Sequence, residues 1–144
     1  MGKIKQEQQE QLYQELANMA VQARENAYVP YSGFSVGAAL LTADGQIYSG
    51  CNIENAAYSP TNCGERTAFF KAVSEGHRAF KAIAIAGWGK EQKPGFAYPC
   101  GVCRQVMMEF CDPETFVVVV TDGETINTHT LKELLPFGFG ADNL

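Results

Sequence analysis

The amino-acid sequence predicts a three-layer α/β/α sandwich, in which helices cover both faces of a central mixed sheet. Segments whose apolar residues recur at helical spacing alternate along the chain with short apolar runs typical of strands. The segment "SVGAALLTADGQIYSGCN" has two such runs on either side of an Asp-Gly pair, which is typical of a β-hairpin. The run "TFVVVV" is apolar at consecutive positions, as expected of a strand that is buried on both faces.

The first half of the chain is predicted to hold one helix, the hairpin and an irregular loop. An amphipathic helix is expected from about Gln8 to Asn26. Its apolar residues at helical spacing are Leu12, Leu16, Met19, Ala20 and Ala23. The segment "YVPYSGF" ends this helix with Pro30 and Gly33, the hairpin follows, and "NIENAAYSPTN" is predicted to be a loop.

The second half alternates helices and strands. The segment "CGERTAFFKAVSEG" predicts a helix that begins at Cys63 and is capped by Gly76. A buried strand "AFKAIAIAGWG" and a loop rich in Gly and Pro come next, before a helix in "GVCRQVMMEFC". Its inward residues are expected to be Val102, Val106 and Phe110. After the strand "TFVVVV", a Thr-rich turn with His129 precedes a short helix "LKELL", for which Thr130 is the expected cap, and a tail.

Length and composition indicate one globular domain over residues 1–144. The sequence is 46% hydrophobic and 19% charged, which is ordinary for such a domain. The start "MGKIKQEQQEQ" has no apolar core of a secretory signal, and no apolar run is long enough to span a bilayer. We therefore expect a cytoplasmic, reducing location, where cysteines more often bind metal or react than form disulfides.

The formal net charge is −5, and the sequence contains no basic block. Affinity for a nucleic-acid backbone depends mainly on Lys and Arg, so a polynucleotide is not an expected partner. A small neutral substrate fits this charge better.

The stretch "YPCGVCRQ" contains a Cys-x-x-Cys pair, which occurs in redox dithiols, structural zinc sites and catalytic metal sites. The predicted helices place Cys63 at the start of one helix, and Cys100 and Cys103 at the start of another. Helix starts favour thiolates, and two of them at one sheet edge would bring three sulfurs together. Three protein ligands with an open fourth position are typical of a catalytic zinc.

Glu65 follows Cys63 by two residues, so its carboxylate can lie beside the open position of the metal. There it can move a proton between activated water and a substrate, which indicates hydrolytic attack on an unsaturated carbon. Three thiolates leave a zinc site formally negative, and Arg66 and Arg104 are both placed to donate hydrogen bonds to sulfur. Of the two, Arg66 is favoured for this compensation.

The segments "CGER" and "PCGVCRQ" resemble the Cys-x-Glu and Pro-Cys-x-x-Cys signature of the zinc-dependent nucleoside and nucleobase deaminases. Together with "VPYSGFSVGAALL" and "GCNIENAAY", they resemble the short cytidine deaminases from about Leu16 to Phe139. The chain departs from the family pattern at Gly64, where Ala is common, and at Tyr98, where a small hydroxyl residue is usual.

The resemblance implies a homotetramer with one Zn²⁺ per subunit. It implies conversion of cytidine and 2′-deoxycytidine to uridine and 2′-deoxyuridine with release of ammonia, in pyrimidine salvage. Water activated by zinc would attack C4 of the pyrimidine, and Glu65 would protonate N3 and then the departing amino group.

The resemblance also implies a set of substrate contacts. Asn52 and Glu54 would hydrogen-bond the ribose, Phe34 would pack on the pyrimidine, and the backbone N–H of Gly64 would hold the O2 carbonyl. Tyr58 and Phe139 would complete the pocket across a subunit boundary, with Phe137 as the other candidate in the tail. All these side-chain contacts have simpler structural alternatives, such as a turn residue or a core aromatic.

Three other functions stay open from the sequence. A redox dithiol leaves Cys63 and Glu65 unexplained, and a structural zinc module lacks a fourth ligand with suitable spacing. A related deaminase acting on another cytosine nucleoside, such as blasticidin S, keeps the chemistry and changes the substrate. Cys51, at a strand end, and Cys111, at a helix end, are expected to pack rather than to bind metal. His77 and His129 lack ligand spacing and are expected to be structural.

Overall fold

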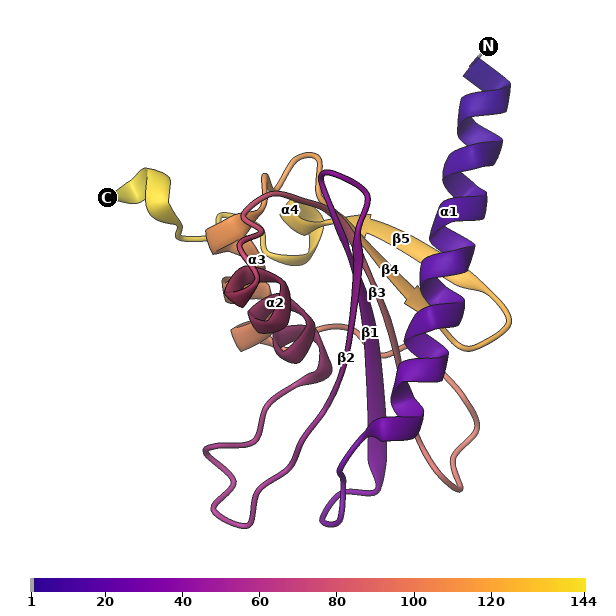
Figure 1. Ribbon diagram of the computed structural model, residues 1–144, viewed down its shortest axis with the longest axis vertical. Helices are drawn as coiled ribbons and strands as arrows, with labels where there is room; N and C mark the ends of the chain where they lie inside the picture. The colour runs from indigo at the N-terminus through magenta and orange to yellow at the C-terminus, as the bar shows by residue number, and fades with distance from the viewer. Residues whose placement is uncertain (1) are drawn as a thin grey trace.

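The computed structural model describes residues 2–144, and it has a five-stranded sheet between two layers of helices (Figure 1). The strands are β1 (Phe34–Thr42), β2 (Ile47–Cys51), β3 (Phe80–Gly89), β4 (Val117–Thr121) and β5 (Ile126–Thr130). The helices are α1 (Gly2–Ala23), α2 (Gly64–Ser74), α3 (Gly101–Phe110) and α4 (Leu131–Leu134), with 3₁₀ turns at Arg24–Asn26 and Ala141–Asn143. None of the helices in this described part combines the length and apolar character needed to cross a bilayer.

The strand order is β2-β1-β3-β4-β5, and the sheet is mixed. β1 pairs antiparallel with β2 and β3, β3 pairs parallel with β4, and β4 pairs antiparallel with β5. The β1–β2 hairpin turns at Gly45, which has a positive φ of 93° that glycine adopts without strain. The parallel pair needs a crossover, and α3 provides it. The predicted α/β/α sandwich with a mixed sheet is therefore confirmed.

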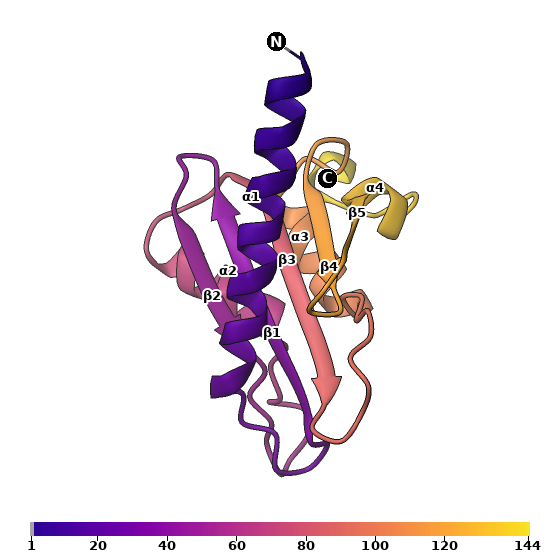
Figure 2. The same ribbon diagram turned by 90° about the vertical axis from the view of Figure 1, so that its right-hand side faces the viewer.

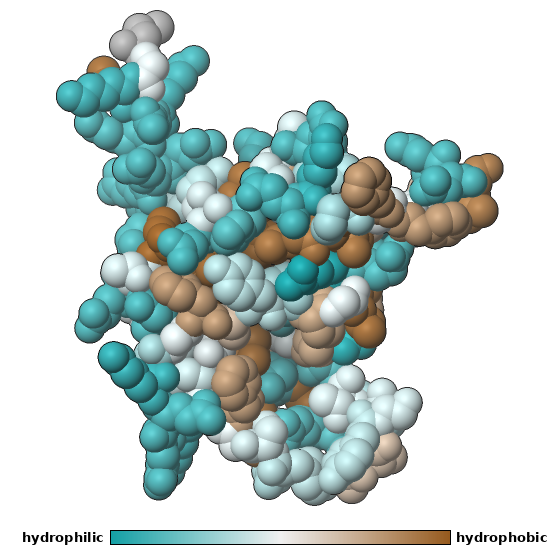
Figure 3. All heavy atoms as spheres, turned by 180° about the vertical axis from the view of Figure 1, so that it is seen from behind, coloured by the Kyte–Doolittle hydropathy of each residue, from teal (hydrophilic) through white to brown (hydrophobic). Residues whose placement is uncertain are grey.

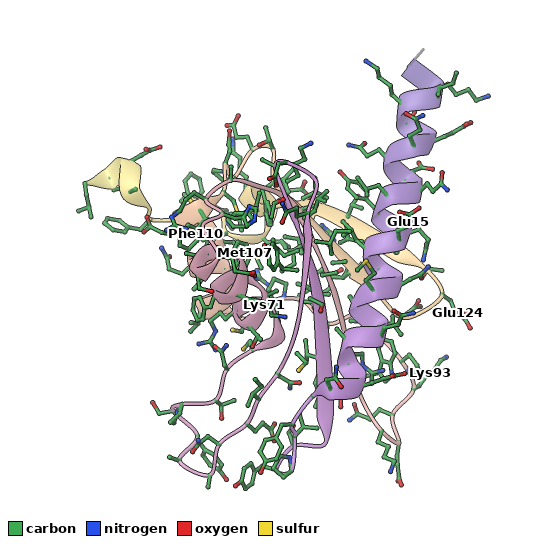
Figure 4. The ribbon with its side chains drawn as sticks, in the orientation of Figure 1. Glu15, Lys71, Lys93, Met107, Phe110 and Glu124 are labelled. Carbon is green, nitrogen blue, oxygen red and sulfur yellow. The ribbon has the colours of Figure 1, made fainter. Side chains whose placement is uncertain are left out.

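Alternating residues of β1 pack against different helical layers. Ala38 and Leu40 belong to the core with α2, α3 and α4, whereas Ala39 and Leu41 belong to the core under α1. α1 crosses one face of the sheet alone (Figure 2). Met107 and Phe110 of α3 lie on the opposite side of the sheet from Glu15 of α1 (Figure 4).

Arg24 fastens the end of α1 to the sheet. Its Nε donates to the carbonyl of Ser35 and its Nη2 to the carbonyl of Trp88, each at 2.9 Å. The guanidinium also lies 3.7 Å from the centre of the Trp88 ring, a cation–π contact. These contacts fix the loop before β1, which leads into Phe34. The loops around residues 27–33, 52–62 and 90–99 gather at this end of the molecule (Figures 1 and 2).

Most predicted elements are confirmed, with differences at the ends of the chain. The first helix begins at Gly2 rather than near Gln8, because its Lys, Gln and Glu residues are strong helix formers even without an apolar face. Figure 3 shows these hydrophilic turns standing clear of the body. The turn predicted around His129 is wrong, since Asn127 to His129 belong to β5, an edge strand held by its pairing with β4.

The inward face predicted for the third helix is wrong at one position. Val102 is 56% exposed, while Cys103 and Met107 are buried. The buried face starts one residue later because the helix turns Cys103 toward the other cysteines. At the end of the chain, Thr130 and Glu133 form the capping box of α4, so the predicted cap is confirmed.

Candidate zinc centre and active site

Two helix starts bring three cysteines together. Cys63 is the N-cap residue of α2 and Cys100 that of α3, both with extended backbone, and Cys103 lies in the first turn of α3. The Sγ atom of Cys100 lies 3.7 Å from that of Cys63 and 3.5 Å from that of Cys103. All three ligand atoms lie within 4.8 Å of one another, and among residues 2–144 this is the only such group of potential metal ligands.

These distances suit a tetrahedral zinc. Zn–S bonds of about 2.3 Å at tetrahedral angles require sulfur atoms about 3.8 Å apart. The thiols of Cys63 and Cys103 share a hydrogen bond, which lowers the pKa of Cys63 to about 5 and, with burial, raises the pKa of Cys103. A divalent cation replaces such shared protons, since it binds cysteine as thiolate. The three cysteines are thus positioned to bind one Zn²⁺, with no fourth protein ligand among residues 2–144.

Glu65 is the buried acid beside the sulfurs. Its side chain is only 4% exposed, and burial raises the pKa of its carboxyl to about 7. Its Oε1 atom is buried without a hydrogen-bond partner in the described part of the chain. An unpaired buried carboxyl oxygen is costly in a folded protein. Glu65 therefore has an acceptor free for a molecule that enters the site.

The two candidate arginines differ in what they contact. Arg66 donates from Nη2 to the Sγ atom of Cys63 at 3.2 Å. Arg104 instead donates to the backbone carbonyls of Pro99 and Leu134. Only Arg66 of the two thus has a hydrogen bond to sulfur.

Cys63, Cys100 and Glu65 open into a small cavity of about 190 Å³, and Cys103 is buried beside them. Its lining residues are Phe34, Val36, Asn52, Thr61, Asn62, Cys63, Glu65, Ile85, Ala97, Tyr98 and Cys100. An adjacent hollow of about 420 Å³ shares Thr61 with it and is also lined by Tyr31, Ser32, Glu54 and Tyr58. Hollows of about 430 and 710 Å³ lie along α1, but no cysteine lines them. The small cavity is therefore identified as the site by its cysteines and Glu65, although other hollows on the surface are larger.

Most of the remaining predicted site residues lie at this cavity or beside it. Phe34 and Asn52 line the cavity, and Glu54 and Tyr58 line the adjacent hollow. Gly64 is buried between Cys63 and Glu65, and a Cβ atom there would lie 3.3 Å from the Val36 carbonyl oxygen. Phe139 lines neither space.

Sequence reasoning missed several residues of this site. Thr61 and Asn62 directly precede Cys63, so their closeness in sequence is a signal that could have found them. Ile85 lines the cavity from β3, and only the three-dimensional path of the sheet reveals it. Tyr98, by contrast, was expected from the sequence at the rim of the pocket; it lines the cavity, and its ring packs edge-on against His129 at 5.4 Å.

Comparisons with known proteins agree with this geometry. The family model for the "Cytidine and deoxycytidylate deaminase zinc-binding region" matches residues 10–120. A cytidine deaminase of Sporosarcina psychrophila is 55% identical over 122 residues, which are 85% of this chain and 87% of that protein. The chain belongs to the cytidine and deoxycytidylate deaminase family.

The crystal structure of a cytidine deaminase from Burkholderia pseudomallei has the same fold, with a TM-score of 0.79 and 46% sequence identity. The match covers 88% of this chain and 98% of the Burkholderia chain. A blasticidin-S deaminase of Bacillus cereus is more distant, at 32% identity over 108 residues, 72% of this chain and 76% of that protein. Membership of this zinc-binding family confirms the expected cofactor, which the three sulfurs are positioned to bind.

Proposed function

We propose that the protein is a cytidine deaminase, which converts cytidine and 2′-deoxycytidine to uridine and 2′-deoxyuridine and releases ammonia. The observation that carries the proposal is the cluster of three sulfurs beside the unpaired Glu65 oxygen, at the edge of one small cavity. The cytidine deaminases among its relatives support the same substrate class. We further propose a cytoplasmic enzyme of pyrimidine salvage.

Cys63, Cys100 and Cys103 would hold the zinc, which would supply the Lewis acid that makes water a nucleophile for C4 of the pyrimidine. Glu65 takes one proton from that water and gives it to N3. After the attack it takes the remaining proton from the new hydroxyl group on C4, which becomes the carbonyl, and gives that proton to the amino group, which leaves as ammonia. The free Oε1 atom in the cavity supports this role.

Other residues of the chain hold the nucleoside in place. Phe34 packs against the pyrimidine, and the Gly64 N–H donates to its O2 carbonyl. Asn52 and Glu54 bind the ribose, chiefly at the 3′-hydroxyl. Their places at the cavity and the hollow beside it support these assignments. Arg66 compensates the negative charge of the thiolates through its hydrogen bond to Cys63.

We propose that the active unit is a homotetramer in which Tyr58 and Phe139 complete the pocket of a neighbouring subunit. Tyr58 is 73% exposed and has a left-handed backbone with φ of 60°, which is uncommon for a residue with a side chain. Phe139 is 59% exposed and Phe137 fully so. Exposed aromatic side chains of this kind are enriched at protein interfaces, which supports the assembly.

The test is turnover of cytidine by the zinc-loaded protein, followed by loss of absorbance and by chromatographic detection of uridine. Glu65→Gln is expected to keep zinc and fold but to lose about 10²–10⁴-fold in kcat, since proton transfer is removed. Glu75→Gln, at the exposed end of the same helix, is the matched control and is expected to be fully active. Near wild-type turnover by Glu65→Gln would contradict the mechanism.

A panel of substrates tests the specificity. Cytosine, deoxycytidylate, blasticidin S and a cytosine-containing oligonucleotide are compared with cytidine at equal concentration. Cytidine and 2′-deoxycytidine are expected to react fastest, because the other compounds lack the free ribose or add a charged or bulky group. A preference for blasticidin S would instead assign the protein to that related activity.

A further inference from the structure

Glu54 joins the loop before β1 to the loop after β2. Its Oε1 atom accepts hydrogen bonds from the backbone N–H groups of Tyr31 and Ser32, at 3.0 and 3.1 Å. Its Oε2 atom accepts the hydroxyl hydrogen of Ser32. The carboxylate lies at the solvent-facing hollow, yet three donors from one short loop fix its orientation.

The hydroxyl of Ser32 has a second contact, because it accepts a hydrogen bond from the N–H of Phe34 at 3.0 Å. The carbonyl of Phe34 accepts from Nδ2 of Asn52 at 2.8 Å, and Oδ1 of Asn52 accepts from the N–H of Val36 at 2.9 Å. The backbone of the cavity aromatic is thus held on both sides by side chains. Within residues 2–144, the Ser32 hydroxyl hydrogen-bonds to both Phe34 and Glu54.

The same contacts limit what Glu54 can bind. A carboxylate offers about four acceptor directions. Two on Oε1 and one on Oε2 are taken by the loop, which leaves a single acceptor direction on Oε2. A sugar hydroxyl can donate to that direction, whereas a group without a hydrogen to donate cannot.

We propose that Ser32 is a positioning residue for sugar recognition: its hydroxyl orients the Glu54 carboxylate so that one acceptor faces the 3′-hydroxyl of the nucleoside. This inference rests on the proposed function, in which Glu54 binds the ribose. Without the Ser32 hydroxyl, the two backbone N–H groups still hold Oε1, but Oε2 loses its donor, so the carboxylate can tilt about Oε1 and Oε2 can bind water. The carboxylate then distinguishes sugars less well by their 3′ substituent.

The test compares three nucleosides, namely cytidine, 2′-deoxycytidine and 2′,3′-dideoxycytidine. Ser32→Ala is expected to raise KM for the first two by about ten-fold while kcat changes little, as for the loss of one hydrogen bond to a charged group in substrate binding. For 2′,3′-dideoxycytidine, which has no 3′-hydroxyl, KM is expected to stay unchanged. Ser32→Thr keeps the hydroxyl and is expected to restore the wild-type pattern.

Two further variants separate positioning from a merely structural role. Ser59→Ala is the matched control, because the Ser59 hydroxyl has no hydrogen-bond partner within residues 2–144. In a Glu54→Gln background, Ser32→Ala is expected to add little, because the group that it orients is already altered. Zinc content and melting temperature of every variant are measured alongside. If Ser32→Ala does not fold, Ser32→Cys, a weaker donor, is expected to give the same selective rise in KM.

Equal losses on all three nucleosides, no loss on any of them, or additive effects of the Ser32 and Glu54 substitutions would overturn the inference. The proposed function fails separately, when the wild-type protein does not form uridine from cytidine, and the inference then falls with it. Wild-type turnover with an unselective Ser32→Ala variant overturns only the role of Ser32.

Discussion

Arg66 is the only positively charged side chain with a hydrogen bond to a sulfur of the site among residues 2–144. Three thiolates with one Zn²⁺ carry a net charge of −1, which weakens the metal as a Lewis acid. In the proposed mechanism, the guanidinium beside Cys63 and the starts of α2 and α3 would offset this charge. The sequence alone favoured Arg66 but left Arg104 open, since each follows a site residue directly. The paths of α2 and α3 separate them, because Arg104 contacts backbone carbonyls instead.

Arg66→Ala is expected to weaken zinc binding by about 10–100-fold, as for the loss of other hydrogen bonds to metal ligands. The measurement is the rate of zinc release to a coloured chelator, which does not depend on turnover. Arg78→Ala is the control, because Arg78 donates only to the carbonyls of Val73 and His77 at the far end of α2. An unchanged release rate in Arg66→Ala would show that Cys63 needs no such partner.

At the scale of elements, the site depends on the close packing of α2 against β2. A Cβ atom at Gly50 would lie 2.5 Å from the backbone nitrogen of Ala68 and 2.6 Å from the carbonyl oxygen of Gly64. Both are backbone atoms that cannot rotate away. The absence of a side chain at Gly50 therefore sets how near the start of α2, with Cys63 and Glu65, lies to the sheet.

Gly50→Ala is expected to lower the free energy of unfolding by about 1–3 kcal/mol, as for overpacking in a core, and to weaken zinc binding because α2 must move. Urea unfolding and zinc release measure the two effects. Gly95→Ala is the matched control, since nothing lies within 4 Å of a Cβ atom there, and it is expected to change stability by less than about 0.5 kcal/mol. Equal stability of the two variants would contradict the packing argument.

The elements that the sequence predicts well are those with a strong pattern. The apolar runs of β1, β3 and β4, the Asp-Gly hairpin and the cap at Thr130 all carry local signals. β5 was missed because "INTHT" has one apolar residue and is held as an edge strand by pairing alone. Likewise, the cysteines and Glu65 follow from spacing, whereas Ile85 and Ser32 reach the site through sheet geometry and loop contacts that no local pattern encodes.

At the scale of the whole molecule, the C-terminal segment lies away from the cavity of its own chain. It stands beyond α3 in Figure 1, where Gln105 donates to the carbonyl of Phe139 at 2.8 Å. Phe137 is fully exposed and has a positive φ of 57°. The exposed aromatic rings of this segment support the proposed contact with another subunit.

Mixed assemblies test whether this tail completes a neighbouring pocket. One variant carries Glu65→Gln with its tail intact, and the other keeps Glu65 but ends after Pro136. Each is expected to be nearly inactive alone. Co-expressed in equal amounts, they are expected to recover about a quarter of wild-type turnover per chain. In a closed symmetric assembly with random mixing, one pocket in four has both an intact Glu65 and an intact neighbouring tail.

Replacing Phe137 or Phe139 by Ala in the Glu65→Gln partner then identifies the inserting ring, since only the substitution of that ring abolishes the recovery. Activity of the mixture no greater than the sum of its parts, or full activity of the truncated chain as a monomer, would contradict a shared pocket.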